Sequence, residues 1–112
     1  MRGVYLVTDR KLCLGRPLEE VILQSLQGGA AYVQLREKEI NTREFIDEAI
    51  TIKKMLNPYQ VPLIINDRVD VALASRADGV HLGQEDMPYE IARRLLGPKA
   101  IIGLSVETWP DV

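Results

Sequence analysis

Short apolar runs alternate with segments of helical spacing along the whole chain, and this alternation constrains the fold more than any other feature. The runs that favour strands cover residues 4–7, 32–35, 62–66, 79–82 and 100–104. Strands that alternate with helices at this spacing are typical of βαβ units, in which right-handed crossovers join parallel strands. We therefore predict an α/β fold whose consecutive strands pair in parallel. Both faces of the sheet should be mostly apolar, and the run at residues 4–7 should be buried on both sides.

The clearest helix follows the second strand. Four of its apolar residues share one helical face, namely Phe45, Ala49, Ile52 and Leu56. Asn41, with Glu44 three residues later, resembles a capping box at the start of this helix. Asn57 and Pro58 should end it, because proline cannot continue a helix.

Three further helices are predicted from similar signals. One covers residues 17–27, with proline just inside its start and glycines after its end, and a short one covers residues 69–75. The last opens at Pro88. Its residues predicted to face the core are Ile91, Ala92 and Leu95.

Composition narrows the class of protein. Lys and Arg number 14 against 16 Asp and Glu, a net charge of −2, so nucleic acid is not an expected partner. Cys13 is the only cysteine, which excludes an internal disulfide and fits a reducing cytoplasm. The apolar run at residues 4–7 is too short for a membrane span or a signal peptide. We expect residues 1–112 to form one cytoplasmic α/β domain that binds neither nucleic acid nor membrane.

Polar side chains gather where the predicted strands end, the edge at which parallel α/β folds build active sites. Gln34, Arg36 and Lys38 are two residues apart, so their side chains share a face if the strand continues. A guanidinium and an ammonium that converge there suit a diphosphate. The alternative is a solvated strand end whose charges pair with neighbouring glutamates.

Two carboxylates follow neighbouring strands. Asp67 and Asp86 lie at adjacent strand ends and could share one Mg²⁺, whose other positions go to water and phosphate oxygens. The alternative is that each carboxylate only caps the helix that follows it. Their place beside Arg36 and Lys38 favours the metal site.

The sequence gives little support for proton transfer, hydrolysis or nucleotide binding. His81, between Val80 and Leu82, is more typical of a packed histidine than of a proton-transfer residue. Ser105 could hold a ring nitrogen or a phosphate oxygen, but no base accompanies it, so hydrolase chemistry is not expected. The glycines lack the spacing of a dinucleotide-binding or P-loop motif.

Five segments, taken together and in order, resemble the family of thiamine phosphate synthase and thiazole tautomerase. They are YLVTD at residues 5–9, QLREK at 34–38, INDR at 65–68, GVHLGQED at 79–86 and IGLS at 102–105. The resemblance spans nearly the whole chain. The family's fold is an eight-stranded TIM barrel, so the resemblance implies that this chain holds about its first five βα units.

The resemblance also implies an activity, the coupling of hydroxymethylpyrimidine diphosphate to hydroxyethylthiazole phosphate, which yields thiamine phosphate and diphosphate. Carried over residue by residue, the substrate-binding set is Gln34, Leu35, Arg36, Glu37, Lys38, Asn66 and Ser105. Asp67 and Asp86 would bind Mg²⁺. Arg36 and Lys38 would be catalytic, because with Mg²⁺ they stabilise charge on the diphosphate as it leaves, before the thiazole nitrogen attacks.

The length departs from the family pattern. A TIM barrel needs about 200 to 250 residues, so 112 residues would leave a sheet with exposed edges. We expect further C-terminal units or a homo-oligomer to complete it, and we expect the 112 residues alone not to make thiamine phosphate. Two alternatives stay open: thiazole tautomerase, and a catalytically silent half-barrel.

Overall fold

The computed structural model describes residues 4–8, 18–37, 40–83 and 86–104. The strands in these ranges are β1 (Val4–Thr8), β2 (Ala30–Leu35), β3 (Leu63–Asn66), β4 (Gly79–Leu82) and β5 (Ile101–Leu104). The helices are α1 (Leu18–Gln27), α2 (Thr42–Leu56), α3 (Val69–Ser75) and α4 (Tyr89–Leu96), with a 3₁₀ turn, η2 (Asn57–Tyr59), after α2. No helix in the described ranges is long and apolar enough to cross a membrane.

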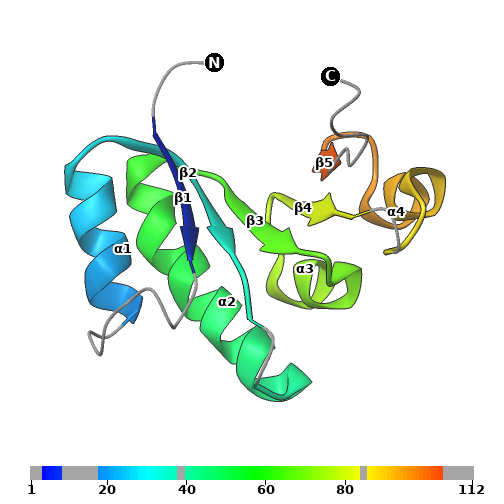
Figure 1. Cartoon of the computed structure of the whole chain (residues 1–112), viewed down its shortest axis with the longest axis horizontal. Coiled ribbons are helices and arrows are strands. Elements are labelled where there is room, and N and C mark those ends of the chain that lie inside the picture. The colour runs from blue at the N-terminus through cyan, green and yellow to red at the C-terminus, as the bar shows by residue number, and fades with distance from the viewer. Residues whose placement is uncertain (1–3, 9–17, 38–39, 84–85, 105–112) are drawn as a thin grey trace, which may run out of the picture.

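The strands form one parallel sheet in the order β1-β2-β3-β4-β5, so each strand pairs with its neighbour in the sequence. This confirms the predicted parallel α/β fold. Because the strand order never reverses, crossovers of one hand place all the helices on the same side of the sheet. Figure 1 shows this arrangement, with α1 to α4 following one another along the outer side of a curved sheet.

The hydrophobic core lies between the helices and one face of the sheet. The strand residues in this core are Val33, Leu35, Leu63, Ile65, Val80 and Leu82. Side chains alternate between the two faces of a strand. The opposite face therefore carries the paired residues Gln34 and Ile64, and Asn66 and His81. No described helix packs on this uncovered face, which carries the apolar Val7 and Ile64 together with the polar Gln34, Asn66 and His81.

Two predictions of burial are wrong. Val7 is 43% exposed, because it lies on the uncovered face of the edge strand β1. In α4, Ile91 and Leu95 are 40% and 48% exposed, and only Ala92 of the three residues predicted to face the core is buried. The reason is position: in the described part of the chain α4 is the last helix of the row, with no helix beyond it (Figure 1).

The predicted start and end of α2 are confirmed. Asn41 Oδ1 accepts a hydrogen bond from the backbone N–H of Glu44 at 2.8 Å, and Glu44 Oε1 accepts one from the N–H of Asn41 at 3.3 Å. The helix ends at Leu56, where Asn57 and Pro58 begin the 3₁₀ turn. The capping box therefore fixes where the chain turns from β2 into α2.

Candidate functional site

The carboxyl ends of β2 and β3 bring two predicted binding residues into contact. Asn66, the last residue of β3, donates from Nδ2 to Gln34 Oε1 of β2 at 2.9 Å. Gln34 is buried, and Asn66 is half-buried beside His81 of β4, its partner in register. These three polar side chains lie on the uncovered face of the sheet, near its carboxyl edge.

Thr8 ties the end of β1 to the end of β2. Its Oγ1 donates to the carbonyl of Gln34 at 3.3 Å and accepts the backbone N–H of Arg36 at 3.2 Å. Thr8 is only 3% exposed, whereas Arg36 is exposed. This buried hydroxyl was missed as a site residue, although its place at the end of the first apolar run was a usable signal.

The strand that would give Gln34 and Arg36 a shared face ends before Arg36. β2 ends at Leu35, and Arg36 and Glu37 follow it outside the sheet. Leu35 points into the hydrophobic core, so only its backbone is available to a ligand. Glu37 is half-buried, and Lys38 and Ser105 lie outside the described residues.

Asp67 occupies a tight turn directly after β3. Its φ of 56° is left-handed, which is uncommon for a residue with a side chain. The N–H of Arg68 donates to the carbonyl of Asn66 at 2.8 Å, across Asp67, and the N–H of Asp67 donates to the carbonyl of His81 at 2.8 Å. The N-cap residue of α3 is Arg68, so the alternative of Asp67 as that helix's N-cap is wrong.

Asp86 closes the loop that follows β4. Its Oδ2 accepts the backbone N–H of Gly83 at 2.6 Å, and its own N–H donates to the carbonyl of Gly83 at 3.2 Å. The N-cap of α4 is Pro88, so Asp86 is not the N-cap of that helix. Both carboxylates therefore belong to loops at the carboxyl edge of the sheet.

The two carboxylates suit a magnesium ion that takes only some of its ligands from the protein. Asp67 and Asp86 offer carboxylate oxygens from adjacent loops, β3 to α3 and β4 to α4. In the described part of the chain no group of three or more His, Cys, Asp or Glu side chains gathers as a metal cage. Mg²⁺ commonly takes one or two carboxylates and keeps waters or phosphate oxygens at its other positions.

Arg68 joins two helices beside this edge. Its Nε and Nη2 pair with the two carboxylate oxygens of Asp70 at 3.0 and 2.8 Å, and Nη2 also donates to Thr42 Oγ1 at 2.9 Å. The guanidinium carbon lies 6.0 Å from the centre of the Phe45 ring.

The ion pair between Arg68 and Asp70 shifts the pKa of both side chains. The hydrogen bond from Arg68 lowers the pKa of Asp70 against the opposing effect of desolvation. The same bond raises the pKa of Arg68, and the negative charges of Asp70 and Asp67 add to that effect. Both pKa shifts favour the charged forms of the two side chains.

His81 faces the space between β4 and β5. It is half-buried, and a Cβ added to Gly103 of β5 would lie 2.8 Å from His81 Nδ1. Gly103 therefore leaves the room that this imidazole occupies. His81 pairs in register with Asn66 of β3, so the two side chains lie on the same face of the sheet.

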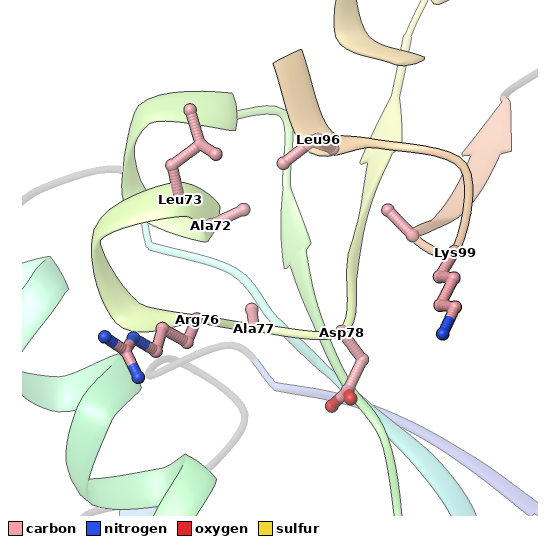
Figure 2. A pocket seen from close by; sticks show the side chains of 8 residues that line it. Ala72, Leu73, Arg76, Ala77, Asp78, Leu96 and Lys99 are labelled. Atoms are coloured by element: carbon pink, nitrogen blue, oxygen red, sulfur yellow. The ribbon is translucent and has the colours of Figure 1, made fainter. Parts of the chain in front are cut away.

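Two hollows of the described residues lie at the opposite, amino edge of the sheet. One, of about 390 Å³, lies between α3, α4 and the starts of β4 and β5, and Figure 2 shows Arg76, Asp78 and Lys99 around it. The other, of about 270 Å³, adjoins Asp78 from the side of α2 and η2. Asp78 accepts bonds from Lys53 Nζ at 2.8 Å and from the N–H of Leu63 at 2.7 Å, which makes it a structural tie. We place the candidate site at the carboxyl edge, where polar groups from several strands converge.

Fold and site together define a class: an α/β protein with consecutive parallel strands, helices on one face and a polar site at the carboxyl edge. The family model described as thiamine monophosphate synthase matches residues 4–111. The chain belongs to this family.

Individual relatives agree with the family. The chain is 61% identical over 111 residues to a thiamine-phosphate synthase of Leptospira biflexa, covering 99% of this chain and 53% of the relative. It is 56% identical to one of Albidiferax ferrireducens, with 97% and 50% covered. A solved structure, thiamine phosphate pyrophosphorylase from Pyrococcus furiosus, superimposes with a TM-score of 0.83 at 43% identity, covering 93% of this chain and 50% of that one. The chain thus spans about half the length of these relatives.

Proposed function

We propose that this chain supplies the pyrimidine-diphosphate half of a thiamine phosphate synthase active site. The reaction joins hydroxymethylpyrimidine diphosphate to hydroxyethylthiazole phosphate and releases diphosphate. The observation that carries the proposal is the contact between Asn66 and Gln34 at the carboxyl edge, flanked by Asp67. These residues match the family's binding motif and come from adjacent strands.

The proposal includes a TIM barrel to which these residues contribute five βα units. Three features support it: the unreversed strand order, the helices on one side of a curved sheet, and the uncovered opposite face. In a TIM barrel that face becomes the packed interior, and the loops after the strands form the active site. The chain's length, about half that of its relatives, leaves room for the other units.

The diphosphate would lie against Arg36 and Lys38. Arg36 follows β2 with its backbone held by Thr8, so its exposed guanidinium starts from a fixed point at the edge. A planar guanidinium can bind a phosphate in bidentate fashion, and lysine adds a mobile positive charge. Asn66 and Gln34, already joined to each other, offer an amide surface for the pyrimidine end of the substrate.

Mg²⁺ would be held by Asp67 and Asp86, and when bound it would neutralise charge on the diphosphate oxygens. Departure of the diphosphate breaks the bond from the pyrimidine methylene carbon to oxygen, and the electron pair leaves with the oxygen. The thiazole nitrogen then forms the new bond to carbon with its lone pair. Arg36 and Lys38 act on the first of these steps by stabilising the leaving group. No acid–base dyad is required.

The relatives favour this synthase activity over the two alternatives. Those named above carry the names thiamine-phosphate synthase or thiamine phosphate pyrophosphorylase. A catalytically silent half-barrel would not require Asn66, Asp67 and Asp86 to gather at one edge of the sheet. Thiazole tautomerase needs no diphosphate site.

The test is a coupling assay on the protein expressed from its complete natural reading frame. With both substrates and Mg²⁺ we expect thiamine phosphate and diphosphate in equal amounts. Asp67→Ala should reduce turnover strongly and leave the fold intact, and Asp47→Ala on the exposed side of α2 is the matched control. Unchanged turnover in Asp67→Ala would refute the metal role, and absence of coupling in the wild type would refute the proposed activity.

A further inference from the structure

We propose that Arg68 is a positioning residue, which acts through the backbone of Asp67 to aim that carboxylate at the metal and diphosphate. The inference rests on the proposed function, because it assumes that Asp67 binds Mg²⁺. Arg68 itself is not expected to touch the substrate: its guanidinium is engaged by Asp70 and Thr42.

Asp67 has a backbone conformation that needs support from its surroundings. Its left-handed φ of 56° is one that most side chains avoid, so the neighbouring structure must impose it. On one side the N–H of Asp67 is bound to the carbonyl of His81 on β4. On the other side stands Arg68, whose N–H reaches back to the carbonyl of Asn66. The turn is therefore held at both of its ends.

The Arg68 side chain is itself held by residues of two helices. Its guanidinium group bonds to both carboxylate oxygens of Asp70 in the first turn of α3, at 2.8 and 3.0 Å. Its Nη2 also bonds to Thr42 at the start of α2. Phe45 lies under the guanidinium. One side chain thus ties the turn to two helices, and such planar, multiple contacts are a property of arginine that lysine does not share.

The contacts of Arg68 with Asp70, Thr42 and Phe45, here called the clamp, lie next to the candidate site. Asp67 lies between Asn66, which is bound to Gln34, and Arg68. If the clamp opens, Asp67 is free to relax to an ordinary backbone conformation, and its carboxylate then points elsewhere. Loss of Arg68 should therefore weaken metal binding without removing a metal ligand.

The experiment measures Mg²⁺ binding by calorimetry in the presence of inorganic pyrophosphate, with the protein from its complete reading frame. Arg68→Lys keeps the positive charge and loses the planar guanidinium. Thr42→Val removes only the hydrogen bond to Thr42 and leaves the contact with Phe45 of α2. The matched controls are Arg94→Lys on α4 and Thr51→Val, whose hydroxyl bonds within α2 to the carbonyl of Asp47. Ile52→Val, in the core, serves as a variant that lowers Tm for reasons unrelated to the site.

We expect Arg68→Lys to weaken Mg²⁺ binding by about 10-fold, as is typical when a residue that orients a ligand is changed. Thr42→Val should weaken it less, and the double variant should be no weaker than Arg68→Lys, because both act through one clamp. Pyrophosphate binding should recover at saturating Mg²⁺, which a general loss of structure would not allow. The three control variants should bind Mg²⁺ like the wild type.

Asp67→Asn separates failure of the inference from failure of the proposed function. If Asp67→Asn loses Mg²⁺ binding while Arg68→Lys and Thr42→Val keep wild-type affinity, the positioning role is wrong and the metal site stands. If Asp67→Asn itself binds like the wild type, the metal role of Asp67 is wrong, and the inference falls with it. If Ile52→Val weakens binding as much as Arg68→Lys does, the effect is one of stability and the positioning role is also wrong.

Discussion

At the scale of single residues, the candidate site depends on side chains that hold backbone rather than on side chains that face solvent. Thr8 Oγ1 fixes the backbone at Arg36, and in the proposed positioning role the Arg68 side chain braces the turn that contains Asp67. A left-handed residue costs about 1–2 kcal/mol for an ordinary side chain, and less for aspartate, which adopts this conformation more often than most residues. Strain of this kind is commonly kept at functional sites.

The strain at Asp67 leads to a prediction about two substitutions. Asp67→Gly should be more stable than Asp67→Ala by about 1 kcal/mol, because glycine adopts a positive φ without steric cost. Both should lose Mg²⁺-dependent binding of pyrophosphate. Urea unfolding measures the difference, and equal stability of the two variants would contradict the left-handed turn.

A second residue-scale prediction concerns pH. The pKa of Asp70 is lowered by Arg68, so the pair stabilises the fold above the ordinary pKa of aspartate, and this contribution is lost as pH falls through the lowered value. Asp70→Asn should therefore cost stability near pH 6 and cost nothing at strongly acidic pH. Because Asp70 is 59% exposed, the cost should be no more than about 1 kcal/mol.

The check is urea unfolding of wild type and variant at several pH values. Asp47→Asn, on the exposed side of α2, controls for general charge effects. A cost for Asp70→Asn that did not change with pH would show that the ion pair is not the cause.

At the scale of elements, the sheet depends on close approach between its last two strands. Gly79 pairs with Ile101, and a Cβ on Gly79 would lie 1.9 Å from the carbonyl oxygen of Ile101. The same two strands meet again where Gly103 makes room for His81. Glycine is thus required at Gly79 for the pairing of β4 with β5.

We predict that Gly79→Ala destabilises the protein by about 1–3 kcal/mol, the usual cost of forcing extra volume into a packed contact. Gly28→Ala is the matched control, because its added Cβ would meet atoms at 3.5 Å and beyond. Thermal unfolding of both variants tests the claim. An equal change in the two Tm values would mean that the approach of β4 and β5 is not as close as described.

At the scale of the whole molecule, the sheet presents one covered face and one uncovered face, between two edge strands. Ile101 and Leu104 of β5 are 43% and 53% exposed, and Ile91 and Leu95 of α4, the helix before β5, are 40% and 48% exposed. Exposed edge strands tend to pair with other chains. The relatives, about twice as long, have further chain with which such a surface could be covered.

We therefore predict that a polypeptide of residues 1–112 by itself self-associates. Sedimentation velocity should show species larger than the monomer, and Leu104→Lys on β5 should shift them toward the monomer. Leu23→Lys, at a 41% exposed position on α1 far along the row of helices, is the control. A monodisperse monomer for the unmodified polypeptide would contradict the prediction.

Much of the fold follows from local sequence signals. The period of the apolar runs predicted the five strands and their parallel order, and β4 and α3 begin and end at the predicted residues. The capping box at Asn41 and Glu44 was confirmed because both of its hydrogen bonds join residues three positions apart. The prediction for α4 was wrong at Ile91 and Leu95, since helical spacing tells which residues share a face and not what covers it.

The sequence by itself determined the elements, their order and the set of polar residues at the strand ends, because spacing, caps and strand ends are local properties. Only the tertiary structure decided which of these residues touch. The bonds from Thr8 to Gln34 and from Asn66 to Gln34 join residues 26 and 32 positions apart. Contacts over such distances depend on strand register and on the side of the sheet to which each helix returns. Those choices are made by packing the whole chain, so no local pattern contains them.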